Sequence, residues 1–227
     1  MANLNTILSI AESVGINDQR FIGQMMSRNQ RISTSEILGV QPFGFDMKPM
    51  NYLLYSQNRD LLASLRYSDR NYEQCLNFGT TGWVNYIAYQ GDMTQPQLIA
   101  CQYQTSSANK TIVLGSLPTI SSTAYIVKAG DFLQIDRYAY IATQDVQRGV
   151  GITVNIPVHR TIMTTLTTTM DAVIGQYGTT QTINGATYTG ITFPVILQQY
   201  PNYVLVPMTN DSFIQWNGTF KAIEAVL

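Results

Sequence analysis

Three aspartates surround one arginine in the segment KAGDFLQIDRYAYIATQDV, and carboxylates held close to a cation can do acid–base chemistry. They are Asp131, Asp136 and Asp145, with Arg137 among them. The segment alternates in a strand-like way, and in a strand only residues two apart share a face. The three carboxylates therefore do not converge merely by being close in sequence. Aspartate at a turn accepts hydrogen bonds from nearby backbone N–H groups, so the pattern favours a structural role.

The other residues that could do chemistry lack the companions that chemistry requires. His159, the single histidine, follows a predicted strand, but no GxSxG or comparable motif supplies a nucleophile. GxxxxGK[ST] and GxGxxG are absent, so no phosphate-binding glycine loop is indicated. Cys75 and Cys101 have no CxxC or histidine partner, and we interpret them as buried thiols. The sequence predicts a protein that is not an enzyme and has no cofactor or metal site.

The composition is weakly charged, which bears on the partners. Of the 227 residues, 12 % are Asp, Glu, Lys or Arg, against about 25 % in typical soluble proteins. The net charge of −1 gives no basic field for nucleic acid and no polybasic patch for a membrane. Such a surface protects poorly against self-association, which we interpret as a surface largely covered by partners. No signal peptide or transmembrane run is recognisable, so the chain is expected to be soluble and made in the cytoplasm.

The apolar pattern divides the chain at Pro42. Residues 1–41 are predicted to be a partner-binding helical arm, with one helix at 3–14, a second at 18–28 and then an extended connector. Residues 42–227 show short alternating strands with frequent turns, which predicts an antiparallel sandwich or half-barrel. A short flanking helix is expected around Leu61–Leu65. The Thr-rich segment 161–190 is treated as an insert, and its Asn184-Gly185 pair predicts a hairpin.

Several strand pairings follow from the positions of the turns. A hairpin is expected across Gly130-Asp131, and the strands flanking the 149–151 loop are expected to pair with each other. Residues 95–105 are predicted to be a strand. At the C-terminus, alternating apolar residues flank Gly218, which is interpreted as a bulge or kink. The apolar strand edge there needs a partner, and pairing with a neighbouring subunit would supply backbone hydrogen bonds.

Together these segments resemble a known family of structural proteins. RNQRISTSEILGVQPFGFDMKP, YSQNRDLLASL, VKAGDFLQI, VNIPVHRTI and YPNYVLVP…FIQWNGTFKAIEAV occur in an order similar to that of small tail or baseplate proteins of contractile-tailed bacteriophages, including those of cyanobacteria. The resemblance implies a fold of the tail-tube type in the virion. It also implies a hexameric ring whose strands form a barrel around DNA or tape protein, with neighbouring tube, hub or wedge proteins as partners and no membrane.

The resulting hypothesis is a non-enzymatic tail protein, an initiator or hub ring at the junction of tube and baseplate. Arg20, Arg28 and Arg31 are the candidate polar contacts of the arm, and Trp216 and Phe220 are candidate core or subunit-contact residues. One alternative is a neck or other head–tail connector protein. Another is a carbohydrate-binding host-recognition module, which would need the rings of Trp83 and Trp216 at the surface.

Overall fold

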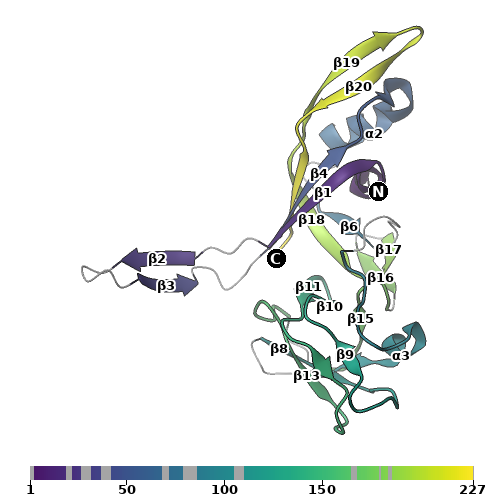
Figure 1. The fold of residues 1–227 in the computed structure, drawn as a ribbon. Helices are drawn as coiled ribbons and strands as arrows, with labels where there is room; N and C mark the ends of the chain where they lie inside the picture. Colours follow the sequence, from purple (N-terminus) through teal and green to yellow (C-terminus); the bar gives the residue numbers. More distant parts are fainter. Residues whose placement is uncertain are drawn as a thin grey trace.

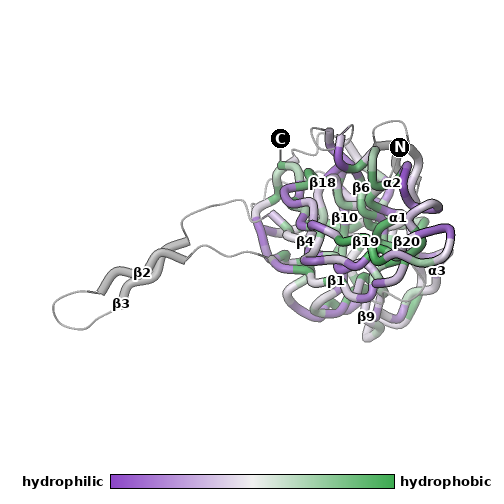
Figure 2. Tube along the Cα trace, turned by 90° about the horizontal axis from the view of Figure 1, so that it is seen from above, coloured by the Kyte–Doolittle hydropathy of each residue, from purple (hydrophilic) through white to green (hydrophobic). Residues whose placement is uncertain are grey.

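The computed structural model describes residues 3–18, 22–26, 32–36, 42–67, 72–78, 86–104, 110–164, 168–178, 180–183 and 186–226. These residues form a mainly β structure of antiparallel sheets, including a half-barrel, as the sequence predicts (Figure 1). The described part of the chain has three helices, α1 (Asn3–Ser9), α2 (Tyr55–Tyr67) and α3 (Gln95–Ala100). Hydrophobic stretches run through the interior of the body, and hydrophilic ones lie mostly around it (Figure 2).

The largest sheet has five antiparallel strands. Their order is β1 (Ala11–Asp18), β4 (Phe43–Pro49), β21 (Phe220–Glu224), β18 (Thr192–Gln199) and β6 (Gln74–Asn77). The alternation in β4 buries Phe43, Phe45 and Met47, as predicted for a strand with one face on a core. Phe193 of β18 packs edge-on against both phenylalanines. This sheet and its core are called the main body below.

Residues 3–18 belong to the main body, so the prediction of an arm over 1–41 is wrong for them. Leu4, Ile7 and Leu8 share one face of α1 and are fully buried in the main core. The helix ends at Ser9, earlier than predicted, and the chain continues as β1, which pairs with β4. The arm prediction failed because the helical spacing of these apolar residues also suits a helix buried by its own domain.

The predicted helix at 18–28 is replaced by an antiparallel hairpin. Strand β2 (Ile22–Met26) pairs along its whole length with β3 (Ile32–Glu36). Gly23 disfavours a helix here, and pairing across a hairpin satisfies the backbone in its place. Figure 1 shows the hairpin standing away from the sheets. Arg20, Arg28 and Arg31 lie outside the described residues.

A second body is inserted between two strands that are neighbours in the main sheet. Strands β6 and β18 pair, with Asn77 opposite Thr192, yet the described chain between them has its own hydrophobic core. This inserted body contains three small sheets, in addition to a two-stranded hairpin described below. Their strands are β7 (Gln102–Tyr103), β8 (Thr111–Gly115), β13 (Val154–Pro157) and β14 (Met170–Asp171); β9 (Tyr125–Val127) and β12 (Val146–Gln147); and β10 (Phe132–Ile135), β11 (Tyr138–Ile141) and β15 (Val173–Ile174).

One predicted pairing in the inserted body is wrong, and a second is confirmed only at one bridge. Strands β9 and β10 do not pair across Gly130-Asp131, since β9 pairs with β12, and β10 pairs with β11 across the tight turn at Asp136-Arg137. Strand β13 pairs along its length with β8, and the segment before the 149–151 loop meets the end of β13 only at the antiparallel Ala142–Val158 bridge, so the pairing predicted across that loop is confirmed only there. Short strands carry too few residues to select a partner, so the packing of the whole body selects it.

Residues 95–105 begin as a helix and not as a strand. The Gln97 side chain accepts a hydrogen bond from the Thr94 N–H at 2.8 Å, which is half of a capping box, and Pro96 lies in the first turn. The chain then forms the two-residue strand β7. The capping residues were visible in the sequence, and the apolar run that follows them was misread as a strand.

The described part of the Thr-rich segment 161–190 contributes strands to the fold and is not a separate insert. Val173 and Ile174 of β15 are buried and pair with β10. Further along, β16 (Thr180–Ile183) and β17 (Ala186–Thr189) form an antiparallel pair with Ile183 opposite Ala186, which confirms the predicted hairpin.

A buried ion pair joins the two bodies. Arg160, which follows β13, donates to both carboxylate oxygens of Glu224 on β21, at 2.6 and 2.7 Å, and neither side chain is exposed. The guanidinium also donates to the Ala139 carbonyl at 2.6 Å and lies against the rings of Phe43 and Tyr140. A carboxylate oxygen of Glu224 accepts from the Phe43 N–H at 3.1 Å as well. Both charges are thus paired and hydrogen-bonded, which a buried ion pair requires.

We expect Arg160→Met to lower the free energy of unfolding by about 3–5 kcal/mol, because it leaves the Glu224 carboxylate buried without its cation. Urea denaturation followed by circular dichroism measures this. Lys48→Met is the matched control, since Lys48 pairs with Glu12 at 3.3 Å where both side chains are about half exposed. The control should lose less than about 1 kcal/mol. Equal losses in the two variants would contradict the importance of the buried pair.

Candidate interaction surface

A long two-stranded ribbon extends from the main body beside α2 (Figure 1). Strand β19 (Asn202–Met208) pairs along its whole length with β20 (Asp211–Asn217), and β20 also pairs with β5 (Leu53–Leu54). Among the described residues β19 has no second partner, so it is the edge of this sheet. Gly218, with a φ of 116°, lies where the chain leaves β20 for β21 of the main sheet. The predicted kink at this glycine is therefore the corner between two sheets.

The free backbone groups of β19 can be identified from its neighbour. On β20, the Ile214 carbonyl accepts from the Tyr52 N–H at 2.9 Å, and the Trp216 N–H donates to the Asn51 side chain at 3.1 Å. Both groups therefore point away from β19. Leu205 lies opposite Ile214, and Tyr203 lies opposite Trp216. Because backbone groups alternate sides in an antiparallel pair, the N–H groups of Tyr203 and Leu205 face the open edge.

Prolines bound this stretch of open edge. Pro201 and Pro207 lie two residues before Tyr203 and two residues after Leu205, and proline has no N–H to donate. Proline is found on edge strands with its nitrogen facing away from the ladder. The edge of β19 therefore offers two backbone donors, enough for a short added strand. No charged residue lies between Asn202 and Met208, although edge strands are usually protected by charge.

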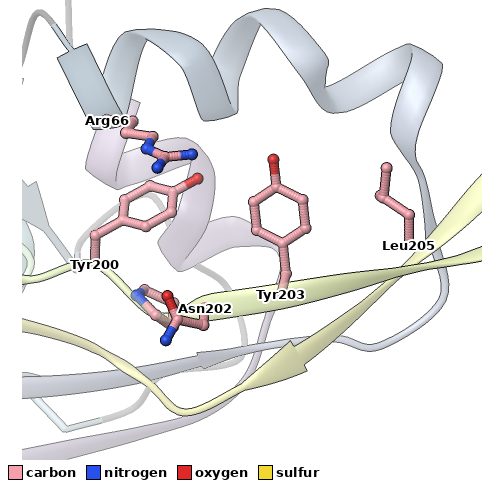
Figure 3. A pocket seen from close by; sticks show the side chains of 6 residues that line it. Arg66, Tyr200, Asn202, Tyr203 and Leu205 are labelled. Atoms are coloured by element: carbon pink, nitrogen blue, oxygen red, sulfur yellow. The ribbon is translucent and has the colours of Figure 1, made fainter.

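A groove runs beside this edge strand (Figure 3). Helix α2 packs over β20 and β5, and a cavity of about 550 Å³ remains beside β19. Its lining residues are Arg66, Tyr200, Pro201, Asn202, Tyr203 and Leu205. Tyr200 and Tyr203 point toward the helix, with the Arg66 guanidinium next to the Tyr200 hydroxyl (Figure 3). Burial raises the pKa of both tyrosines above the ordinary value.

Apolar side chains on the same strand are exposed. Val204 is 51 % exposed, and Leu205 and Met208 are each 41 % exposed. Tyrosine, arginine and exposed aliphatic residues next to a free strand edge are typical of a protein–protein contact. The edge of β19 and the groove beside it, including Arg66, are called the ribbon surface below.

A second exposed apolar feature lies on the inserted body. In the loop between β12 and β13, Val150 is 98 % exposed and Ile152 is 87 % exposed. Arg148 supports the loop from inside, donating to the Pro118 carbonyl at 3.0 Å and to the Gly151 carbonyl at 2.6 Å. Its guanidinium is therefore occupied by carbonyl groups of its own chain, one in the loop and one outside it.

The acidic cluster around Arg137 is structural. Asp131 accepts hydrogen bonds from the N–H groups of Gln90 and Lys128, and Asp145 accepts from the Ala129 N–H, all at 2.8 Å. Burial raises the pKa of the Asp131 carboxyl, and the two backbone hydrogen bonds oppose that rise. Asp136 lies in the turn between β10 and β11 with a φ of 53°.

Arg137, at the centre of that cluster in sequence, pairs with Glu73 and not with the aspartates. An acid–base centre of Arg137 and the three aspartates is therefore not assembled. The interpretation of the aspartates as turn residues is confirmed.

His159 also has a structural role. Its Nδ1 accepts a hydrogen bond from the Ile141 N–H at 2.9 Å, while its own backbone N–H donates to the Ile141 carbonyl at 3.0 Å. The imidazole is buried against the Phe43 ring. His159 thus binds the end of β11 through both its backbone and its side chain.

The predicted aromatic contacts are buried within this chain. Trp216 and Phe220 belong to the main core and pack on each other with ring centroids 5.4 Å apart. The core alternative is therefore the correct one for both residues, and neither is available to a partner in this arrangement. Trp83 lies outside the described residues.

Neither the ribbon surface nor the burial of Arg160 was predicted from the sequence. The alternation in YPNYVLVP was recognised as a strand, but its position at an edge depends on the pairing of the whole sheet.

Cys75 and Cys101 are buried free thiols, and burial raises the pKa of each to about 11. No group of three or more His, Cys, Asp or Glu residues in the described ranges is arranged to hold a metal ion. Within the same ranges, no helix has the length and apolar character needed to cross a membrane. No protein-family model matches this chain, and no curated protein sequence matches it significantly.

His159→Ala should lower the free energy of unfolding by about 1–3 kcal/mol, because the Ile141 N–H loses its acceptor in a buried site. His159→Asn is the matched control, since the asparagine side-chain oxygen can take the place of Nδ1. Thermal unfolding followed by circular dichroism would compare the two. If Asn is as destabilising as Ala, the hydrogen bond to Ile141 is not the main contribution of this residue.

Proposed function

We propose that this protein is a non-enzymatic structural subunit of a bacteriophage tail that assembles into a ring, as a tube initiator or hub component where the tube meets the baseplate. The observation that supports assembly most directly is the ribbon surface. It combines an uncharged open strand edge with exposed Val204, Leu205 and Met208. A monomer that left this edge uncovered would be prone to uncontrolled edge pairing.

The low charge of the whole chain supports the same proposal. A net charge of −1 on 227 residues provides little repulsion between copies. Strand addition across subunits would satisfy the free backbone groups of Tyr203 and Leu205 and cover the apolar side chains beside them. The tail assignment itself depends on the resemblance of the ordered segments to phage tail and baseplate proteins.

Two other functions make different predictions. A neck or head–tail connector protein would use the same surfaces, and the two roles separate when the virion is mildly disrupted and the chain is located in one subassembly. A carbohydrate-binding module needs aromatic rings presented to solvent. The burial of Trp216 removes one of the two tryptophans proposed for that role, although Tyr52 and Tyr67 are exposed.

The test of assembly is the mass of the purified protein across a concentration series, measured by light scattering. We expect a discrete ring of about six copies or growth into tubes visible by electron microscopy, as in cyclic or open heterologous assemblies. Leu205→Lys should raise the concentration needed for assembly by about tenfold or more, because it places a charge on the contact.

Ile196→Lys is the matched control for this variant. Ile196 has the same 41 % exposure, but it lies on β18, which is flanked by strands on both sides. The control should assemble like the wild type. A wild-type protein that stays monomeric at every concentration would contradict the proposal, and equal effects of the two lysines would exclude the ribbon surface as the contact.

A further inference from the structure

We propose that the ribbon surface of one copy receives the β2–β3 hairpin of a second copy, with β3 added antiparallel to β19 and Glu36 meeting Arg66. This inference depends on the proposed assembly and specifies its contact. The result would be a continuous sheet across the subunit boundary, in the order β5, β20, β19, then β3 and β2 of the other copy.

The hairpin needs a partner. Strands β2 and β3 pair with each other over five residues each, and neither joins a larger sheet in the described part of the chain. An isolated two-stranded hairpin is marginally stable in water and normally requires a third strand or a packed face. Figure 1 shows the hairpin standing away from its own main body. A sheet edge on another molecule would provide the missing strand.

The open edge matches the hairpin in length. Between Pro201 and Pro207 the edge of β19 offers the N–H groups of Tyr203 and Leu205, so a longer strand would gain no further hydrogen bonds from N–H donors of β19. The five residues of β3 span the same distance as residues 201–205, at about 3.3 Å per residue. An edge bounded by prolines therefore fits a short strand better than a long one.

Charge sets the direction of the added strand. Arg66 lies at the Tyr200–Asn202 end of the groove and forms no ion pair with any described residue. Glu36 is the only acidic residue in β2 and β3, and it lies at the end of β3. Antiparallel pairing with β19 puts Glu36 at the Arg66 end and Ile32 beside Leu205. Parallel pairing would put the acidic residue at the apolar end.

The chain's own hairpin is not the expected occupant. In Figure 1 the hairpin and the β19–β20 ribbon extend from the main body in different directions. A contact between different copies is also heterologous, since the hairpin of one subunit meets the ribbon of the next. Contacts of this type close into rings or continue as filaments, which is the assembly proposed above.

The test mixes two full-length proteins that each carry one new cysteine. Glu36→Cys and Arg66→Cys are combined and treated with a short bismaleimide crosslinker, which tolerates more separation than a disulfide does. The native thiols should not react with the crosslinker, because Cys75 and Cys101 are buried with pKa values near 11. We expect a crosslinked dimer containing one copy of each protein, identified by mass spectrometry. Wild-type protein with crosslinker measures the background.

Asp60→Cys replaces Arg66→Cys in the matched control. Asp60 lies on the same helix with a side chain that is 97 % exposed, but it is not part of the groove. Its mixture with Glu36→Cys should give at most background crosslinking. Equal yields from the two mixtures would show nonspecific collision and overturn the inference.

Exchanging the charges of residues 36 and 66 tests the same contact without a crosslinker. Glu36→Arg and Arg66→Glu should each raise the assembly concentration by about tenfold, and the double variant should restore it, as expected for a coupled pair. Additive losses in the double variant would overturn the inference. So would a crosslink within one chain in a Glu36→Cys/Arg66→Cys protein.

The outcomes separate this inference from the proposed function. If the wild type assembles but neither crosslink nor rescue occurs, the hairpin contact is wrong and the ring-forming proposal stands. If the wild type is monomeric throughout, both fail.

Discussion

The ion pair between Arg160 and Glu224 is the constraint on which the two-body structure depends. It joins a residue that follows β13, at the edge of one small sheet, to β21 in the middle of the main sheet, with no exposed surface on either side chain. Burying one of these charges without the other would cost several kcal/mol, so the bodies must meet in the arrangement that brings them together. Reciprocal hydrogen bonds between the Gln134 side chain and the Thr192 backbone, both at 2.7 Å, fix the same junction.

The turns and strand ends in the interior of this molecule are hydrogen-bonded within the chain, whereas two strand edges at its extremities are open. The turn aspartates and His159 all serve the backbone of the same chain. The ribbon and the hairpin instead present strand edges that nothing in the described chain covers. Open strand edges at the extremities suit a subunit whose final contacts are made by assembly, as proposed above. Interface burial would then contribute to the stability of the assembled form.

Sequence reasoning succeeded where the signal is local. The alternation of Phe43, Phe45 and Met47, the Asn184-Gly185 hairpin and the aspartate turns all depend on a few adjacent residues. It failed where an apolar run suits either a helix or a strand, as at 18–28 and 95–105, and where short strands had to choose a partner. Strands β6 and β18 pair although the entire inserted body lies between them in the chain. No periodicity in the sequence indicates a pairing over that distance.

The sequence by itself determined the mainly β class, the low charge and the absence of recognisable catalytic motifs, because these follow from composition and from the short periods of strands and turns. Only the tertiary structure decided that Trp216 and Phe220 are core residues, that Arg160 bridges two bodies and that β19 is an open edge. The physical reason is that burial and edge position are properties of the whole sheet. A strand with the same residues would be protected in the middle of a sheet and is exposed at its margin.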